Sequence, residues 1–294
     1  MSKKRKVFVY FQMKKWGREV LSLLDGLVTP AVIEKLTSEN SDSFYGDNGE
    51  WLDSAIRSAD PGKDIDESSF QFLASRFRER YTHIRVFHGC RPVDVGEYYQ
   101  RGFLPMDPEQ LIETARRYFL RGQLKEINEG LLEKAIAEIS TKHRANHIYF
   151  VLDDRHLLNG AGEYLIYGSE YLYCLAIRLT GNCESILRKM GIPTIFACDL
   201  PVEMVDSWAI DELVGHLLST LFRSFESGEK KTAPKTRFSF WIKRALPSEF
   251  IHSHYHPSHI RDSHNYHIVH ESIETSCPFC KRPQEHIQKN QGRQ

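Results

Sequence analysis

Two short segments carry the residue types that cleavage of a bond between nicotinamide and ribose would require. An apolar run that predicts a β-strand ends at His88 and Gly89. A histidine at a strand end can hydrogen-bond a ribose hydroxyl, and a glycine lets an amide group approach the backbone closely. Further along, Tyr164 and Tyr167 offer rings for stacking, and Glu170 offers a carboxylate. That carboxylate could stabilise the positive charge of an oxocarbenium-like transition state.

Arg91 follows the His-Gly pair directly. Its planar guanidinium could hold a pyrophosphate through paired hydrogen bonds. Each of these residues also has a purely structural interpretation. His88 can be an ordinary packed histidine, Tyr164 and Tyr167 can pack a sheet, and Arg91 can form a surface ion pair.

The two segments together resemble the ADP-ribosyltransferase superfamily, in particular its His-Tyr-Glu branch, which includes diphtheria-like toxins and the poly(ADP-ribose) polymerases. The resemblance rests on residues 87–91, 102–105, 148–150 and 164–170, and it spans residues 84–250. It implies an α+β fold with a split mixed or antiparallel sheet. It also implies transfer of a single ADP-ribose from NAD, used as substrate, to a macromolecule.

The resemblance assigns roles to individual residues of this chain. NAD binding falls to His88, Gly89, Arg91, Tyr164 and Tyr167. Catalysis falls to His88, Tyr167 and Glu170.

The identity of the catalytic acid stays open in the sequence. In the best-known relatives a glutamate begins a late strand, whereas residues 237–240 contain no acid. Glu170 can replace that glutamate from another segment, Glu249 can occupy its place, or the standard acid is absent.

The C-terminal region contains a candidate zinc site. Cys277 and Cys280 have the spacing of a zinc knuckle, and seven histidines lie between residues 252 and 270. We expect His267 and His270, the nearest in sequence, to complete the ligand set. Alternatively, the tail is a solvated terminus, or its histidines lie at the acceptor side of the cleft.

A basic stretch with aromatic residues leaves two classes of acceptor open. Its basic residues are Lys230, Lys231, Lys235, Arg237, Lys243 and Arg244. Phe238, Phe240 and Trp241 lie among them, as in grooves that bind single-stranded nucleic acid. Phe238, Phe240 and Ile242 also alternate as in a half-buried strand, so the rings can simply belong to the core, and nucleic acid and protein acceptors are both retained.

The resemblance extends to small toxins of bacterial defence or toxin-antitoxin systems, which would imply a neutralising partner. Two other functions fit the same residues. Water could be the acceptor, which would make the protein an NAD glycohydrolase. Alternatively, the chain is a zinc-stabilised nucleic-acid-binding module, in which His88 is structural.

The bulk composition is that of a globular protein. The 294 residues include 39 basic and 39 acidic side chains and are 41% hydrophobic, so no overall field indicates a partner. Scattered cysteines and the absence of a long apolar run predict a cytoplasmic protein without a membrane partner. We expect a mainly helical extension over residues 1–80, the catalytic core over 81–251 and a His/Cys-rich tail over 252–294. Strands are expected at 148–152, 173–177, 194–198 and 238–242, and one long amphipathic helical stretch over 109–142.

Overall fold

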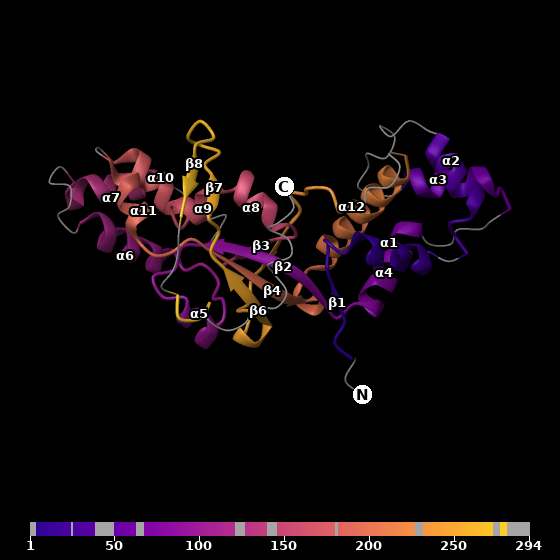
Figure 1. Cartoon of the computed structure of the whole chain (residues 1–294), viewed down its shortest axis with the longest axis horizontal. Coiled ribbons are helices and arrows are strands. Elements are labelled where there is room, and N and C mark those ends of the chain that lie inside the picture. Colours follow the sequence, from indigo (N-terminus) through magenta and orange to yellow (C-terminus); the bar gives the residue numbers. More distant parts are fainter. Residues whose placement is uncertain are drawn as a thin grey trace. The chain divides into compact units, whose positions relative to one another are not determined.

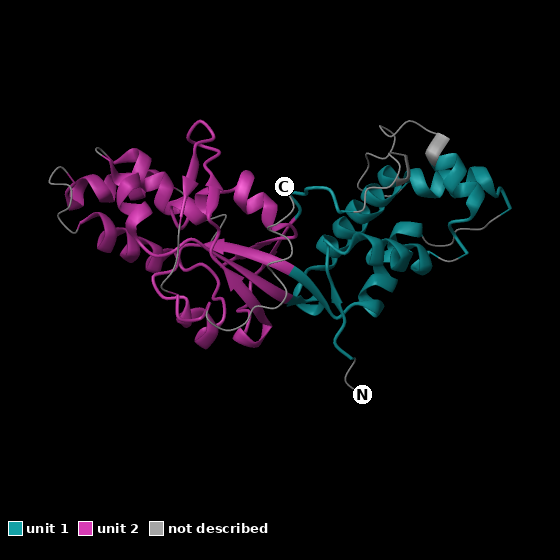
Figure 2. Ribbon diagram, viewed as in Figure 1, with its two compact units in different colours: residues 1–85, 200–238 teal, residues 86–199, 239–294 magenta. Residues whose placement is uncertain are grey.

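The computed structural model describes residues 4–24, 26–38, 50–62, 68–120, 127–139, 146–179, 182–226, 232–272 and 277–280. These residues form an α+β fold, which confirms the predicted class (Figure 1). The chain divides into two compact units, one of residues 1–85 with 200–238 and the other of residues 86–199 with 239–294 (Figure 2). No helix in the described ranges is long and apolar enough to cross a membrane.

The first unit is mainly helical. Its helices are α1 (Met13–Leu23), α2 (Pro30–Ser38), α3 (Glu50–Ala59), α4 (Ser69–Arg80), the 3-10 turn η2 (Val202–Met204) and α12 (Ser207–Glu226). The buried ring of Phe8 contacts the rings of Trp16 and Phe77, with centroids 6.0 Å and 5.3 Å away. Arg78 joins α4 to α12 through a 2.6 Å ion pair with Asp211. Aromatic packing and this ion pair therefore hold the helices of the unit together.

A sheet with the strand order β5-β3-β2-β4-β6 forms the centre of the fold. Its strands are β2 (His83–Cys90), β3 (Ile148–Val151), β4 (Thr194–Pro201), β5 (Ser239–Ile242) and β6 (Ile251–Tyr255). The pairs of β3 with β2, β3 with β5, and β4 with β6 are antiparallel, whereas β1 (Val7–Phe8) joins the start of β2 in parallel. β2 is thus the central strand, and its last residues carry the predicted histidine motif. A separate hairpin consists of β7 (His259–Arg261) and β8 (Val269–Glu271).

The helices of the second unit begin at residues that favour helix starts. Polar side chains accept a backbone N–H of the first turn at Asp107, Asn128, Asp153, Ser169 and Asn182. The helices that follow them are α6 (Pro108–Phe119), α7 (Glu129–Glu138), α8 (Asp154–Asn159), α10 (Glu170–Arg178) and α11 (Cys183–Lys189). The helices α5 (Gly96–Arg101) and α9 (Glu163–Ile166) have no side-chain cap. Figure 1 shows α8 and α9 on one side of β2 and α5 on the other.

One predicted strand is wrong, because residues 173–177 lie within α10. The run is apolar throughout, and such a run does not distinguish a strand from a buried helix by itself. Ser169 caps the segment as a helix, and the buried positions Tyr171, Leu172, Leu175 and Ala176 follow the helical period. The long amphipathic stretch 109–142 forms two helices, α6 and α7, and its residues 121–126 and 140–142 lie outside the described ranges.

The division into units differs from the expected domains. Residues 200–238 belong to the same unit as residues 1–85, so the helical part is built from two stretches of chain. The described part of the expected tail, residues 252–272 and 277–280, belongs to the unit that contains β3 and contributes β6, β7 and β8.

Gly102 permits a close approach of two backbone segments at the end of α5. Its φ of 74° lies in a region that other residues rarely adopt. A Cβ added there would lie 2.1 Å from the carbonyl oxygen of Leu246. The approach lets Phe103 and Leu246 exchange two backbone hydrogen bonds, of 2.8 Å and 2.9 Å. The strand-like pairing of residues 103 and 246 therefore depends on glycine at this position.

We predict that Gly102→Ala lowers the free energy of unfolding by about 3 kcal/mol or more, because it combines backbone strain with a steric clash. Chemical denaturation followed by circular dichroism measures the change. Gly62→Ala is the matched control, since the nearest atom to its added Cβ lies 3.8 Å away. Equal stability of the two variants would contradict the assigned role of Gly102.

Candidate metal centre and predicted NAD site

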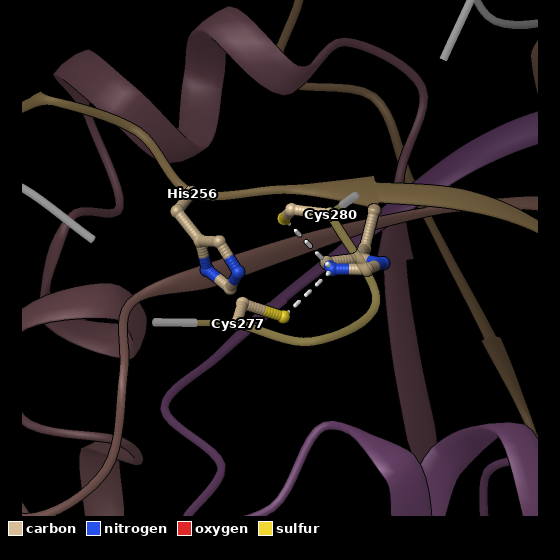
Figure 3. A group of neighbouring side chains, drawn as sticks. His256, Cys277 and Cys280 are labelled. Carbon is tan, nitrogen blue, oxygen red and sulfur yellow. Dashed lines mark hydrogen bonds between the residues drawn. The ribbon is translucent and has the colours of Figure 1, made fainter. Parts of the chain in front are cut away.

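Four side chains converge to form a candidate metal centre. The ligand atoms of His254, His256, Cys277 and Cys280 all lie within 4.8 Å of one another. His254 and His256 belong to β6 and the residue after it, whereas the cysteines belong to a turn closed by the hydrogen bond from Cys280 N to Cys277 O. Figure 3 shows His256, Cys277 and Cys280 pointing toward one another, with dashed lines from both sulfurs to a second imidazole. Two thiolates and two imidazoles are a ligand set that can hold a metal such as zinc.

The distances within the cluster agree with tetrahedral coordination. Nε2 of His254 lies 3.5 Å from Sγ of Cys277 and 3.3 Å from Sγ of Cys280. A zinc ion with ordinary bond lengths separates a nitrogen and a sulfur ligand by about 3.6 Å at the tetrahedral angle. These two distances therefore match the separation of nitrogen and sulfur ligands around one such ion.

Hydrogen bonds outside the cluster orient both imidazoles. Nδ1 of His254 lies 2.7 Å from the hydroxyl of Tyr99, and Nδ1 of His256 lies 2.9 Å from the carbonyl oxygen of Pro193. Since a carbonyl only accepts, His256 carries its proton on Nδ1. Its Nε2 is buried, has no hydrogen-bond partner among the described residues, and presents a lone pair. This arrangement is the second layer of contacts that metal-ligating histidines usually have.

Burial also keeps His254 in the form that binds metal. Its side chain is almost completely buried, and desolvation together with the neighbouring His256 lowers its pKa to about 4. The ring is therefore neutral at pH 7, as a metal ligand must be.

Aromatic packing holds the cysteine turn in place. The ring of Phe279 stacks on the ring of Tyr99, with centroids 5.4 Å apart. Phe279 also lies against Gly96, where an added Cβ would approach its ring to 3.0 Å. Tyr99 therefore contacts both halves of the ligand set, because it also bonds His254.

The predicted ligands His267 and His270 are replaced by His254 and His256. Nε2 of His270 lies 3.4 Å from the buried carboxylate of Asp262, and His267 lies in the loop between β7 and β8 with a φ of 58°. Sequence proximity favoured the wrong pair, because the hairpin carries these two residues away from the cysteines. The alternation of His252, His254 and His256 along one strand was the signal that the sequence offered.

We predict one equivalent of bound metal per chain, measured by elemental analysis of the purified protein. Cys277→Ser should abolish metal retention and lower the free energy of unfolding by about 3 kcal/mol or more, because it removes one of four ligands. Cys174→Ser is the matched control, since Cys174 is partly buried in α10 and lies outside the cluster. Equal metal content in both variants would exclude the proposed centre.

His88 lies on the central strand and packs on the α5 side of the sheet. Its ring contacts the rings of Phe103 and Phe150, with centroids 4.8 Å and 5.7 Å away. Its Nδ1 donates to the carbonyl oxygen of Tyr149 at 2.8 Å. Burial lowers the pKa of His88, so the ring is neutral and Nε2 is available as an acceptor.

Gly89 faces the opposite side of the sheet, toward α8 and α9. An added Cβ there would lie 3.1 Å from the side chain of Leu157 and 3.4 Å from that of Leu165. The glycine thus makes room for two leucines, and only its backbone groups could serve a ligand. The second predicted segment lies on this side, because Leu165 belongs to it.

The tyrosines of that segment differ in their surroundings. Tyr167 is fully buried, donates to Asp262 at 2.5 Å and stacks on Tyr173. Tyr164 is partly exposed and donates to Glu170 at 3.3 Å. Of the two rings, only that of Tyr164 is open to a ligand in this conformation.

Arg91 holds neighbouring backbone segments together through hydrogen bonds. Its guanidinium donates to the backbone carbonyl oxygens of Met190, Leu165 and Arg188. Burial lowers the pKa of the guanidinium to about 10. The residue therefore ties the end of β2 to α9 and to the end of α11, and these contacts occupy the groups that were expected to bind phosphate.

A second acid lies on the His88 side of the sheet. Glu249 is exposed and belongs to the turn η3 (Ser248–Phe250), which directly precedes β6. The turn follows Leu246, whose backbone pairs with Phe103, and Phe103 packs on His88. His88 and the segment of Glu249 are thus linked through one phenylalanine, whereas Glu170 begins a helix that follows α9.

We predict that Arg91→Lys lowers the free energy of unfolding by about 2 to 3 kcal/mol, because an ammonium group cannot reach three carbonyl oxygens in the geometry of a guanidinium fork. Thermal unfolding checks this against the control Arg101→Lys at the exposed end of α5. Unchanged stability with weaker NAD binding would instead support phosphate binding by Arg91.

Comparisons with known proteins do not assign the chain to a family. No protein-family model matches the sequence, and neither the curated proteins nor the solved structures include a match.

Proposed function

We propose that this protein is a mono-ADP-ribosyltransferase that transfers ADP-ribose from NAD to a macromolecular acceptor. The observation that carries the proposal is the link from His88 through Phe103 to the segment of Glu249. It connects a neutral histidine near the end of the central strand with a distant segment of the chain, in which the exposed Glu249 follows Leu246 by three residues. The contact of Gly89 with Leu165 adds the Tyr164 segment to the same strand end.

His88 is suited to binding a ribose hydroxyl. Its Nδ1 is committed to Tyr149, and Nε2 of the neutral ring can accept a hydrogen bond from a hydroxyl group. The backbone groups of Gly89 are the proposed contacts for the nicotinamide amide. Neither contact requires His88 or the Gly89 backbone to gain or lose a proton.

Tyr164 has the more accessible ring of the two tyrosines, and Glu249 is the better acid. Stacking by Tyr164 would have to occur at the strand end, because its segment lies on the side of the sheet opposite His88. Tyr167 would have to break its bond to Asp262 before its ring could reach a ligand. Glu249 is preferred over Glu170 because its segment lies on the side of the sheet that His88 faces. In this proposal Tyr167, Arg91 and Glu170 support the fold around the site.

The proposed reaction breaks one bond and forms one. The bond between ribose C1′ and the nicotinamide nitrogen breaks, and nicotinamide leaves with the electron pair. The acceptor nucleophile then bonds C1′ and transfers its proton to Glu249 or to solvent. A carboxylate at this place stabilises the positive charge that develops on the ribose.

We also propose that the metal centre binds zinc and is structural. Two cysteines and two histidines supply all four positions of a tetrahedral zinc ion, so no position is left open for a substrate. The same cluster also supports a second candidate function. In that case the protein is a zinc-stabilised nucleic-acid-binding module without NAD chemistry. That candidate predicts bound zinc but no release of nicotinamide.

We predict that Glu249→Gln lowers nicotinamide release from NAD by about 100-fold or more, because the amide cannot stabilise the cationic transition state. The assay measures free nicotinamide and the transfer of labelled ADP-ribose to RNA, DNA and protein fractions. Glu129→Gln on the exposed surface of α7 is the matched control. Glu170→Gln, measured in parallel, tests the other acid.

Each outcome of this assay has a distinct meaning. A large loss in Glu170→Gln but not in Glu249→Gln would reverse the assignment of the acid. Nicotinamide release without a labelled macromolecule would indicate an NAD glycohydrolase. If the wild-type protein releases no nicotinamide with any fraction, the proposed function is wrong.

A further inference from the structure

We propose that the face of the sheet formed by β3 and β5 binds single-stranded nucleic acid through Tyr149 and Trp241. The two residues are direct partners in the antiparallel pairing of these strands, so their side chains lie on the same face. Tyr149 is 42% exposed. The pair thus presents adjacent rings on an accessible surface.

Alternation along the two strands separates this face from the core. Ile148, Phe150, Phe240 and Ile242 are buried on one side. Tyr149, Val151, Ser239 and Trp241 are exposed or partly exposed on the other. β5 is an end strand of the sheet order, so the aromatic pair lies near one edge. Tyr149 and Trp241 therefore lie on the side of the two strands opposite to these buried residues.

One lysine gives this face a positive charge, and a histidine adds a third ring. Nζ of Lys243 lies 5.2 Å from the ring centroid of Trp241. The ring of His147 packs edge-on against Trp241 at 4.6 Å and lies 5.8 Å from the ring of Tyr149. A cation thus lies beside the aromatic rings on this surface.

Single-stranded nucleic acid is the ligand whose chemistry matches both features. Every unpaired base has a face that can stack on an aromatic ring. The backbone of the strand carries one negative charge per nucleotide. The bases of a duplex are stacked on one another and do not offer these faces. The surface therefore favours a single strand over a duplex and over a merely acidic partner.

Not all aromatic residues of the basic stretch have rings that are open for stacking on a base. Phe240 is buried, and Phe238 packs against His216 at 5.5 Å. Trp241 is the member of this group that lies on the open face, and its partner Tyr149 comes from a strand about 90 residues earlier. This inference does not depend on NAD chemistry, since it concerns binding alone. It deepens the proposed function only by indicating what the acceptor could be.

The test measures binding of fluorescent 12-nucleotide RNA and DNA strands to the full-length protein by anisotropy, without NAD. Tyr149→Thr removes the ring but keeps a residue that favours strands, whereas Tyr149→Phe keeps the ring. We expect the threonine variant to bind at least about tenfold more weakly and the phenylalanine variant to bind like the wild type. Lys243→Gln should reduce the dependence of log affinity on log salt by about 0.7.

Two further measurements make the test decisive. Base stacking should quench the fluorescence of Trp241, and Trp241→Phe should remove that part of the signal. Polyglutamate and a duplex of the same sequence are the comparison ligands, and circular dichroism checks that each variant is folded. Equal affinity of the wild type and folded Tyr149→Thr, or equal binding of polyglutamate, would overturn the inference. So would absence of binding to both strands at low salt. Preference for RNA or for DNA would identify the kind of strand.

Discussion

The contact between Gly102 and the backbone of Leu246 is the constraint on which much of the second unit depends. A side chain at position 102 would collide with the Leu246 carbonyl, so only glycine permits the pairing of residues 103 and 246. That pairing fixes Phe103 beneath His88 and sets where the segment of Glu249 begins. A contact between two stretches of backbone thereby determines which polar side chains can share one side of the sheet.

Helix α5 extends this organisation to the metal centre. Within two turns it presents Gly96 and Tyr99 to the cysteine turn, and Tyr99 also bonds a histidine ligand. Its neighbour Tyr98 packs against Phe103 and Phe196. The short helix therefore contacts the metal ligands on one part of its surface and the packing around His88 on another. Both candidate sites are supported by the same six-residue element.

The sequence predicts the α+β class and the strands β2 to β5, but not β6, β7 and β8, because the predicted strands are the ones with clear local apolar runs or alternation. It does not predict the surroundings of single side chains. Arg91 and Tyr167 have the right types for a ligand site, yet Met190 and Asp262 engage them through contacts between residues distant in the chain. The histidine ligands were missed for the same reason. Spacing identified Cys277 and Cys280, but only the path of the β7–β8 hairpin decides which histidines return to meet them.

The order of the ligands along the chain has a consequence for chain entropy. His256 precedes the β7–β8 hairpin and Cys277 follows it, so a metal ion held by both would close a loop of roughly 20 residues. Closing a loop of that length removes conformational freedom from the unfolded chain that corresponds to about 3 kcal/mol in simple polymer models. The closed loop contains Asp262, which accepts a hydrogen bond from the hydroxyl of Tyr167. Metal binding thus favours the folded hairpin, against which the Tyr164 segment packs, by lowering the entropy of the unfolded chain.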